Sequence, residues 1–530
     1  MRPTETQSRL LLMGFALVLS LEMFLVLSNV GLDLADEGFL WVGVDSIFRG
    51  LVPILDFRSY DPGRYYWGSM VCSWVGPGLI SLRFSLFLFQ ALSLFLAFDT
   101  ARRLKLGRWE WLLLGPCLTL WMFPYYKVFE QGMAILTLWA AVRVLEDPRP
   151  RNWAWAGACA GVAIWFGRQI GAYALLTYFG LAVLRFPGLP KTGRLRALAA
   201  VAGGLLVGLL PLEVMLVSIR GFAGAYLASF LENIRLGSNG YILTPPWPWK
   251  LNLWHGWTVS TFSHAAISIL FLAVPLSGLW GLGGLWRSRA DRRSPDPGQA
   301  RWMGAVLTGI PWFHYAFYRG DITHLFPALQ VLTLGILAVA GRKIRVRRFL
   351  LALLLLASGS IAWSEFQLGG ILLKYGKWDR ITLRGQSLHL QPETIRVIRS
   401  VQQVVLPRLG PGENAAFFPL LAGLYPSLDL ATPVWDTYVS YPASDRQQAR
   451  MIGDLGIHRV TWVVVAEASF DGRDDLTFER LDPVVWAYLL GHYDRIAVPA
   501  APAYLMWFHL RPDIPKSKSG HGAGGGGLKE

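Results

Sequence analysis

Apolar runs long enough to cross a membrane recur along most of this sequence, from the N-terminus to about Trp363. Each has roughly 18 or more residues, the length that a helix needs to span a hydrocarbon core. The composition agrees, because 53% of the 530 residues are hydrophobic and only 16% are charged. We therefore predict a polytopic α-helical membrane protein.

The pattern changes after the last apolar run, at about Glu365. The segments "PETIRVIRSVQQVV", "SDRQQARMIGDLG" and "DPVVWAYLLGHY" predict helices, whereas "RVTWVVV" and "AYLMWFHL" predict strands. The alternation favours a small α/β domain. We expect a transmembrane domain over residues 1–364, this α/β domain over residues 365–513 and a flexible tail over residues 514–530.

The distribution of Lys and Arg predicts the topology, because basic residues mark the cytoplasmic loops. They gather in alternate loops, for example at Arg102–Arg108 and Lys343–Arg348. The formal net charge of +15 therefore gives no reason to expect a nucleic-acid partner. With the N-terminus inside and the α/β domain outside, about eleven spans are expected, centred near residues 20, 88, 116, 139, 160, 178, 208, 274, 309, 333 and 356.

Charged residues are concentrated just after the first apolar run, in Leu34–Gly68. Apolar side chains recur at helical spacing over Leu40–Leu51, which predicts a short helix lying in the membrane interface. Asp61-Pro62-Gly63 then supplies a turn before an aromatic segment restarts at Arg64. We expect two interfacial helices that form a platform in this first outer loop.

The acids of the loop have a structural interpretation and a chemical one. Asp36 immediately precedes the predicted helix, where aspartate is a good N-cap, and Glu37 in the first turn suits the helix dipole. Asp45 and Arg49 predict an exposed i,i+4 pair. On spacing alone, capping is the simpler role for Asp36.

Further charged residues lie at the predicted outer ends of later spans. A cation at membrane depth is costly unless it faces a cavity or a partner, although any one of them could instead snorkel to the interface. As a set they predict an anion-binding site near the outer leaflet. They are Lys127 and Glu130 in "FPYYKVFEQG", Arg168 in "WFGRQIGAY", and Arg319, Asp321 and His324 in "HYAFYRGDITHLFP".

Acids beside such cations suit transfer from a phosphate-linked lipid. A carboxylate can take the proton of an acceptor hydroxyl as it attacks a sugar, while Arg and Lys neutralise the departing phosphate. We expect Arg58 to join Lys127, Arg168 and Arg319 around that phosphate, although Arg58 and Asp56 could equally be solvated loop charges.

Four segments resemble those of a known family: "ADEG", "FRGLVPILDFRSYDPG", "GRQIGAYALL" and "YRGDITHLFPAL". The chain resembles the polytopic GT-C glycosyltransferases, most of all bacterial relatives of the protein O-mannosyltransferase and lipid A aminoarabinose transferase group. The resemblance implies a bacterial inner-membrane enzyme that uses a polyprenyl-phosphate sugar donor and an extracytoplasmic acceptor. It also implies a catalytic acid in the first outer loop, which matches Asp36 as the base, with Glu37 beside it.

Cofactor use is left open, because some members of this family use a divalent cation and others do not. We assign no cofactor and no metal ligand, since the histidines, among them His255, His264 and His314, form no helical metal-ligand pair. Asp61 is either a second functional acid or a turn residue.

Two other functions use the same features. A transporter or flippase of a lipid-linked saccharide would need the outer cations but not Asp36 as a base. A non-catalytic membrane scaffold would use its outer domain to bind a partner, but would not need acids and bases on one face. Long internal repeats would favour transport, and no self-similar halves are seen in the sequence.

Overall fold

A computed structural model describes residues 4–236, 243–251, 256, 258–288, 295–341, 343–366 and 368–512. The chain divides into two compact units, each described by itself below. The membrane unit is Met1–Gly31, Pro53–Leu55 and Ser59–Trp378, and the C-terminal unit is Leu32–Val52, Asp56–Arg58 and Asp379–Glu530. The predicted tail over residues 514–530, and His255, lie outside the described residues.

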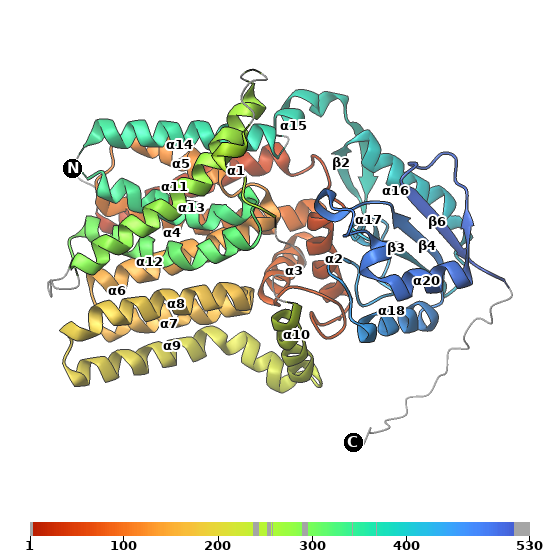
Figure 1. Ribbon diagram of the computed structural model, residues 1–530, viewed down its shortest axis with the longest axis horizontal. Coiled ribbons are helices and arrows are strands. Elements are labelled where there is room, and N and C mark those ends of the chain that lie inside the picture. The colour runs from red at the N-terminus through yellow and green to blue at the C-terminus, as the bar shows by residue number, and fades with distance from the viewer. Residues whose placement is uncertain are drawn as a thin grey trace. The chain divides into compact units, whose positions relative to one another are not determined.

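The membrane unit is helical (Figure 1). Every centre of the eleven predicted spans falls within a helix. The helices are α1 (Glu5–Leu27), α3 (Gly63–Val75), α4 (Leu79–Ala101), α5 (Arg108–Leu120), α6 (Val128–Glu146), α7 (Pro150–Phe166), α8 (Arg168–Arg185), α9 (Lys191–Ser218), α10 (Phe222–Leu236), α11 (Val259–Ser288), α12 (Pro297–Tyr318), α13 (Ile322–Val339), α14 (Ile344–Ser364) and α15 (Leu368–Lys374).

Among the described residues, eight helices are long and apolar enough to cross a membrane by length and composition alone. The other three predicted spans correspond to α5, α7 and α12. The first two have 13 and 17 residues, and α12 is longer but contains polar and aromatic residues such as Gln299 and His314. These features place the protein among multi-pass membrane proteins.

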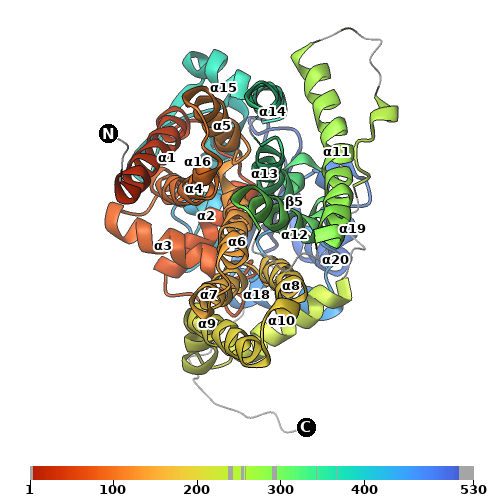
Figure 2. The same ribbon diagram turned by 90° about the vertical axis from the view of Figure 1, so that its left-hand side faces the viewer.

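Helix α6 is central in the bundle. Figure 2 shows it surrounded by neighbouring helices, and it packs against α4, α7, α8, α12 and α13. Two pairs of glycines allow α7 and α9 to approach closely. A Cβ on Gly157 would lie 2.1 Å from the carbonyl oxygen of Val201, and one on Gly208 would lie 2.2 Å from that of Ala158. Small residues four apart favour such helix packing in membranes.

The C-terminal unit is an α/β domain joined by part of the first loop. Its elements are α2 (Asp36–Phe48), β1 (Asp379–Leu383), β2 (Gln386–Leu390), α16 (Pro392–Val404), β3 (Asn414–Phe418), α17 (Leu424–Ser427), α18 (Asp445–Ile457), β4 (Val460–Ala466), α19 (Phe478–Leu481), α20 (Pro483–His492), β5 (Tyr493–Ile496) and β6 (Leu505–Leu510). The five helices and strands predicted from sequence are all present.

The larger sheet has the strand order β3-β4-β6-β5 (Figure 1). Strand β3 pairs with β4 in parallel, and β6 pairs antiparallel with β4 and β5. Every residue of β4 is buried, as expected for an unbroken apolar strand at the centre of a sheet. Strands β1 and β2 form a separate antiparallel hairpin.

Helix α2 packs closely on α17 within this unit. A Cβ on Gly38 would lie 2.4 Å from the backbone nitrogen of Gly423, and the N–H of Gly423 donates to the carbonyl of Leu34 at 2.8 Å. Only glycine allows this backbone contact. Asp36, Glu37 and Asp45 of the first loop are therefore carried by the same compact unit as the α/β domain, whereas Asp61 belongs to the membrane unit.

Candidate functional site

Asp36 is the first residue of α2 rather than the residue before it. No side chain caps this helix from the N-cap position, which is Ala35. Instead, the carboxylate of Asp33 accepts the N–H groups of Ala35 at 2.9 Å and Asp36 at 3.3 Å. The expectation that Asp36 is the N-cap is thus wrong, because Asp33 already binds the amide groups that begin the helix.

The carboxylate of Asp36 has a partner that is distant in sequence. The hydroxyl of Tyr438 donates a hydrogen bond to Oδ1 of Asp36. The ring of Tyr438 stacks on Phe39, one turn further along α2, with 4.8 Å between ring centroids. Glu37 is buried beside Asp36. The spacing of residues in the sequence did not indicate that Tyr438 contacts Asp36.

Three carboxylates therefore lie close together at the start of α2. Desolvation by the surrounding protein, followed by the charges of Asp36 and Glu37, raises the pKa of Asp33 to about 6. Asp33 consequently changes charge near neutral pH, next to the candidate base.

The far end of α2 is fixed by ion pairs. Asp45 pairs with Arg49 at 2.9 Å and also with Arg384, and both arginines bind Asp429. Arg384 belongs to the turn between β1 and β2. The i,i+4 pair of Asp45 and Arg49 is as expected, but Asp45 is buried rather than exposed, because Arg384 covers it.

Arg58 and Asp56 have partners within the C-terminal unit. Arg58 forms an ion pair with Asp436 and lies 5.5 Å from the ring of Tyr441. Asp56 accepts the N–H of Val52 at 2.7 Å, which closes a turn of the loop. Both residues thus have structural contacts, and the role of Arg58 at a phosphate stays a prediction.

Asp482 is the most unusual acid of this unit. It is completely buried, and among the described residues neither of its carboxylate oxygens has a hydrogen-bond partner. Burial and the negative charge of Asp436 raise its pKa to about 7, against the opposing effect of Arg58. We expect Asp482 to be largely protonated below neutral pH.

In the membrane unit, Asp61 and Arg168 form one buried ion pair. Nε of Arg168 lies 2.8 Å from Asp61, which also accepts the backbone N–H of Arg168 at 2.8 Å. The guanidinium further donates to the Tyr226 carbonyl and to the Ser229 hydroxyl, and it lies over the Tyr226 ring. Asp61 thus joins the first loop to the beginning of α8.

Arg64 and Glu130 form a second buried pair, 3.2 Å apart. Arg64 lies 4.6 Å from the Tyr60 ring and 5.6 Å from the Phe129 ring, so aromatic faces enclose this cation. Its hydrogen bond to the Phe166 carbonyl adds a third contact. The sequence analysis named Glu130 but missed Arg64 as its partner.

Asp321 is the centre of a third group. It caps α13 by accepting the N–H of His324, and its carboxylate lies 2.8 Å from both Arg319 and the ring of His324. Although burial opposes the effect, His324 and Arg319 hold the pKa of Asp321 well below its usual range. Three residues predicted from one short segment are thus in direct contact.

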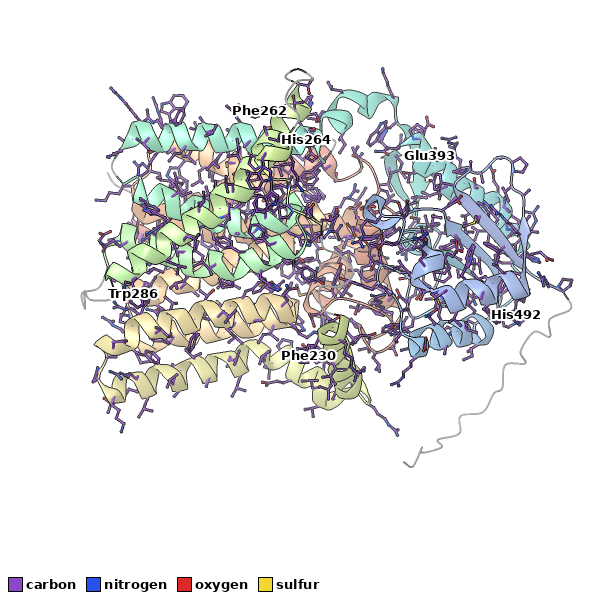
Figure 3. All side chains as sticks on the ribbon, viewed as in Figure 1. Phe230, Phe262, His264, Trp286, Glu393 and His492 are labelled. Atoms are coloured by element: carbon purple, nitrogen blue, oxygen red, sulfur yellow. The ribbon has the colours of Figure 1, made fainter. Side chains whose placement is uncertain are left out.

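A pocket of about 550 Å³ adjoins this group. Its polar lining includes Asp321, Lys250, His264 and Glu365, and its apolar lining includes Trp247. Figure 3 shows His264 and Trp286 near opposite ends of α11, and the pocket lies at the His264 end.

Two residues of the pocket wall, Trp247 and Glu365, contact neighbouring side chains. Trp247 is stacked between Trp249 and Phe317, with ring centroids 5.1 and 6.1 Å away. Glu365 lies 3.5 Å from His264 and accepts the Ser263 hydroxyl at 2.8 Å. Stacked aromatic rings therefore form part of the wall, and its acid Glu365 is already engaged.

Lys250 differs from Lys127, Arg168 and Arg319, the cations of the membrane unit that the sequence analysis named. It is exposed, and it makes no hydrogen bond or ion pair with the described residues. Arg168 and Arg319 are both neutralised by a carboxylate, and Lys127 lies 5.8 Å from the Tyr126 ring. Sequence analysis passed over Lys250, although a cation in the segment "PPWPWK" could have suggested it.

Within the described ranges, no group of three His, Cys, Asp or Glu side chains could hold a metal ion.

No family profile matches the sequence, and no curated protein matches it. Solved structures, however, resemble it in fold. The crystal structure of ArnT from Cupriavidus metallidurans bound to undecaprenyl phosphate aligns with a TM-score of 0.51 and 14% identity, over 95% of this chain and 98% of that one. AglB, an archaeal oligosaccharyltransferase from Archaeoglobus fulgidus in complex with an inhibitory peptide and a dolichol-phosphate, aligns with a TM-score of 0.41 and 10% identity, over 97% and 75%. The likeness to ArnT extends over nearly the whole of both chains, and this protein therefore has the GT-C fold.

Proposed function

We propose that this protein is a membrane glycosyltransferase that moves a sugar from a polyprenyl-phosphate donor to an extracytoplasmic acceptor hydroxyl. The observation that carries the proposal is the carboxylate of Asp36, which begins α2 and is held by the Tyr438 hydroxyl in a chain of GT-C fold. ArnT, a protein of similar fold, was crystallised with undecaprenyl phosphate. A lipid phosphate is therefore the first donor class to test.

In the proposed reaction, Asp36 takes the proton of the acceptor hydroxyl. The acceptor oxygen forms a bond to the anomeric carbon as the bond from that carbon to the phosphate oxygen breaks, and the lipid phosphate leaves. Direct attack of this kind inverts the configuration at the anomeric carbon. Glu37 is buried next to Asp36 and is the second acid in the first turn of α2.

The phosphate requires cations, and we propose that Lys250 provides the main one. It lines an apolar pocket and makes no ion pair with the described residues, so it can neutralise an added anion without breaking an existing contact. Arg319 contacts Asp321, which lines the same pocket. Arg319 and Lys127 are the next candidates, as the sequence analysis expected.

Arg58 and Arg168 are weaker candidates for the phosphate. Each is already engaged by a carboxylate, Asp436 and Asp61 respectively. Releasing either cation to a phosphate would leave a buried carboxylate uncompensated, which is costly. We propose that Arg168 instead fixes the first loop to α8.

We further propose that the α/β domain and the first loop are extracytoplasmic, in the inner membrane of a bacterium. The concentration of Lys and Arg in alternate loops supports this orientation. Cysteine labelling with a membrane-impermeant reagent, at the exposed Gly453 of α18, would test it. We expect the introduced cysteine to be labelled in intact spheroplasts. Labelling only after lysis would show that the α/β domain is cytoplasmic.

The function is tested by deleting the gene and analysing the envelope glycans, glycolipids and glycoproteins by mass spectrometry. We expect one sugar to disappear from one class of acceptor and to return when the wild-type gene is restored. Accumulation of an unused lipid-linked sugar should accompany the loss. If a complete lipid-linked saccharide accumulates on the cytoplasmic face instead, the protein is a transporter.

A further inference from the structure

The α/β domain contributes a side chain to the candidate base. Among the described residues, the hydroxyl of Tyr438 is the side-chain group seen to donate a hydrogen bond to Asp36. Tyr438 precedes α18, and Asp36 lies in the first loop, yet both belong to the C-terminal unit. The contact is therefore internal to one compact body.

Tyr438 is itself held on several sides. Its buried ring stacks on Phe39 of α2 and makes an edge contact with Phe470 at 6.3 Å. Its backbone N–H donates to Asp436 at 3.0 Å, and Asp436 is the partner of Arg58. A side chain fixed in this way can hold a carboxylate in one orientation, as outer partners do for catalytic groups.

We infer that Tyr438 is a positioning residue of the α/β domain, which holds the carboxylate of Asp36 in the orientation needed to take the proton of the acceptor. The inference rests on the proposed function. It gives the α/β domain a direct part in catalysis, in addition to any role in acceptor binding.

The ionisable groups near Asp36 are few. Asp33 and Glu37 flank it in sequence, and Tyr438 faces it from the segment before α18. On α17, which packs against α2, the hydroxyl of Tyr425 is bound to the backbone N–H of Phe417. Arg384 and Asp429 meet α2 only at Asp45 and Arg49, about 13 Å away along the helix axis. Loss of the Tyr438 hydroxyl should therefore be felt at Asp36.

The test is Tyr438→Phe, which keeps the ring and its stacking on Phe39 but removes the donor. Purified protein in proteoliposomes is supplied with undecaprenyl-phosphate-linked mannose, glucose or aminoarabinose, together with a membrane extract of the deletion strain as acceptor. We expect kcat to fall by about 10- to 100-fold with little change in KM for the donor. We also expect the lower limb of the pH–rate profile to move to higher pH, because ionised Asp36 loses a hydrogen bond.

Tyr493→Phe is the matched control. Its hydroxyl also makes a buried hydrogen bond in the C-terminal unit, to the Val460 carbonyl at 2.7 Å, but not to the first loop. It should lower the melting temperature without moving the pH–rate profile. If Tyr438→Phe keeps the wild-type kcat and profile while Asp36→Asn is inactive, the inference is wrong and the proposed function stands. If Asp36→Asn is fully active, Asp36 is not the base and the inference fails with that assignment. If the wild-type protein transfers no sugar from any of these donors, the proposed function itself fails.

Discussion

Charge is arranged differently in the two units of this protein. In the membrane unit, several buried or half-buried cations are matched by acids, as in Arg168 with Asp61 and Arg64 with Glu130. At the start of α2, by contrast, Asp33, Asp36 and Glu37 gather, and the partner seen for Asp36 is a neutral hydroxyl. Compensated pairs suit a stable scaffold, whereas gathered acids suit a group that accepts a proton.

The largest effect on stability is expected from breaking a matched pair. Asp61→Asn leaves the half-buried Arg168 without its counter-charge, and removing one partner of a buried pair costs about 3–5 kcal/mol. Thermal unfolding in detergent should show a large drop in melting temperature. Adding Arg168→Gln should restore part of it, because the uncompensated charge is then gone.

Asp147→Asn provides the comparison for that variant. Asp147 pairs with Arg149 and Arg151, both of which are mostly exposed, and such pairs contribute about 0–1 kcal/mol. Equal losses in Asp61→Asn and Asp147→Asn would contradict the view that the matched pairs form the scaffold.

The attachment of α2 to α17 can be broken at Gly38. A Cβ there would lie 2.4 Å from a backbone atom of Gly423, and such overpacking typically costs about 1–3 kcal/mol, more than the roughly 1 kcal/mol that alanine gains in a helix. We expect Gly38→Ala to lower both the melting temperature and transfer. Gly453→Ala on α18, where nothing lies within 4 Å, should be neutral or slightly stabilising.

The pocket cation can be tested at Lys250. Lys250→Ala should raise KM for the undecaprenyl-phosphate donor about tenfold, or roughly 1.4 kcal/mol, with a small change in kcat. Arg220→Ala removes another exposed cation that does not line the pocket and should leave KM unchanged. An unaltered KM in Lys250→Ala would remove this pocket from the donor site.

The pH dependence of stability in the C-terminal unit can be tested at Asp482. The pKa of Asp482 is raised to about 7 in the folded protein, so the folded state holds its proton more tightly than the unfolded state. Asp482 therefore contributes a loss of stability as the pH rises from about 4 to 7. Asp482→Asn should raise the melting temperature more at pH 8 than at pH 5, and an equal effect at both would contradict this assignment.

Much of the membrane unit could be predicted because its helices are determined by local sequence. Continuous apolar runs give α9 and α13 directly, and the triplet of Arg319, Asp321 and His324 lies within six residues. Helix α3 begins at Gly63, inside the predicted Asp61-Pro62-Gly63 turn and one residue before the predicted restart at Arg64. Patterns with a period of a few residues are the part of the fold that a single sequence reveals.

The contacts of the candidate site could not be predicted because they join distant segments. Nothing in the first loop indicates that Tyr438 would donate to Asp36, or that Arg384 would cover Asp45. The sequence predicted that Arg168 lies at the outer end of a transmembrane span. Its ion pair with Asp61, however, depends on how the first loop folds back onto α8. Spacing shows which charges share a helix and not which ones meet across the fold.

The central claim is that the carboxylate of Asp36 drives sugar transfer. Asp36→Asn keeps the size of the side chain, and its amide oxygen can still accept the hydroxyl of Tyr438, so the fold should persist. The measurement is the rate of transfer of labelled sugar from undecaprenyl-phosphate donors by wild-type and Asp36→Asn protein in proteoliposomes. We predict a loss of about 100-fold or more at unchanged donor binding and melting temperature; transfer at the wild-type rate would contradict the account.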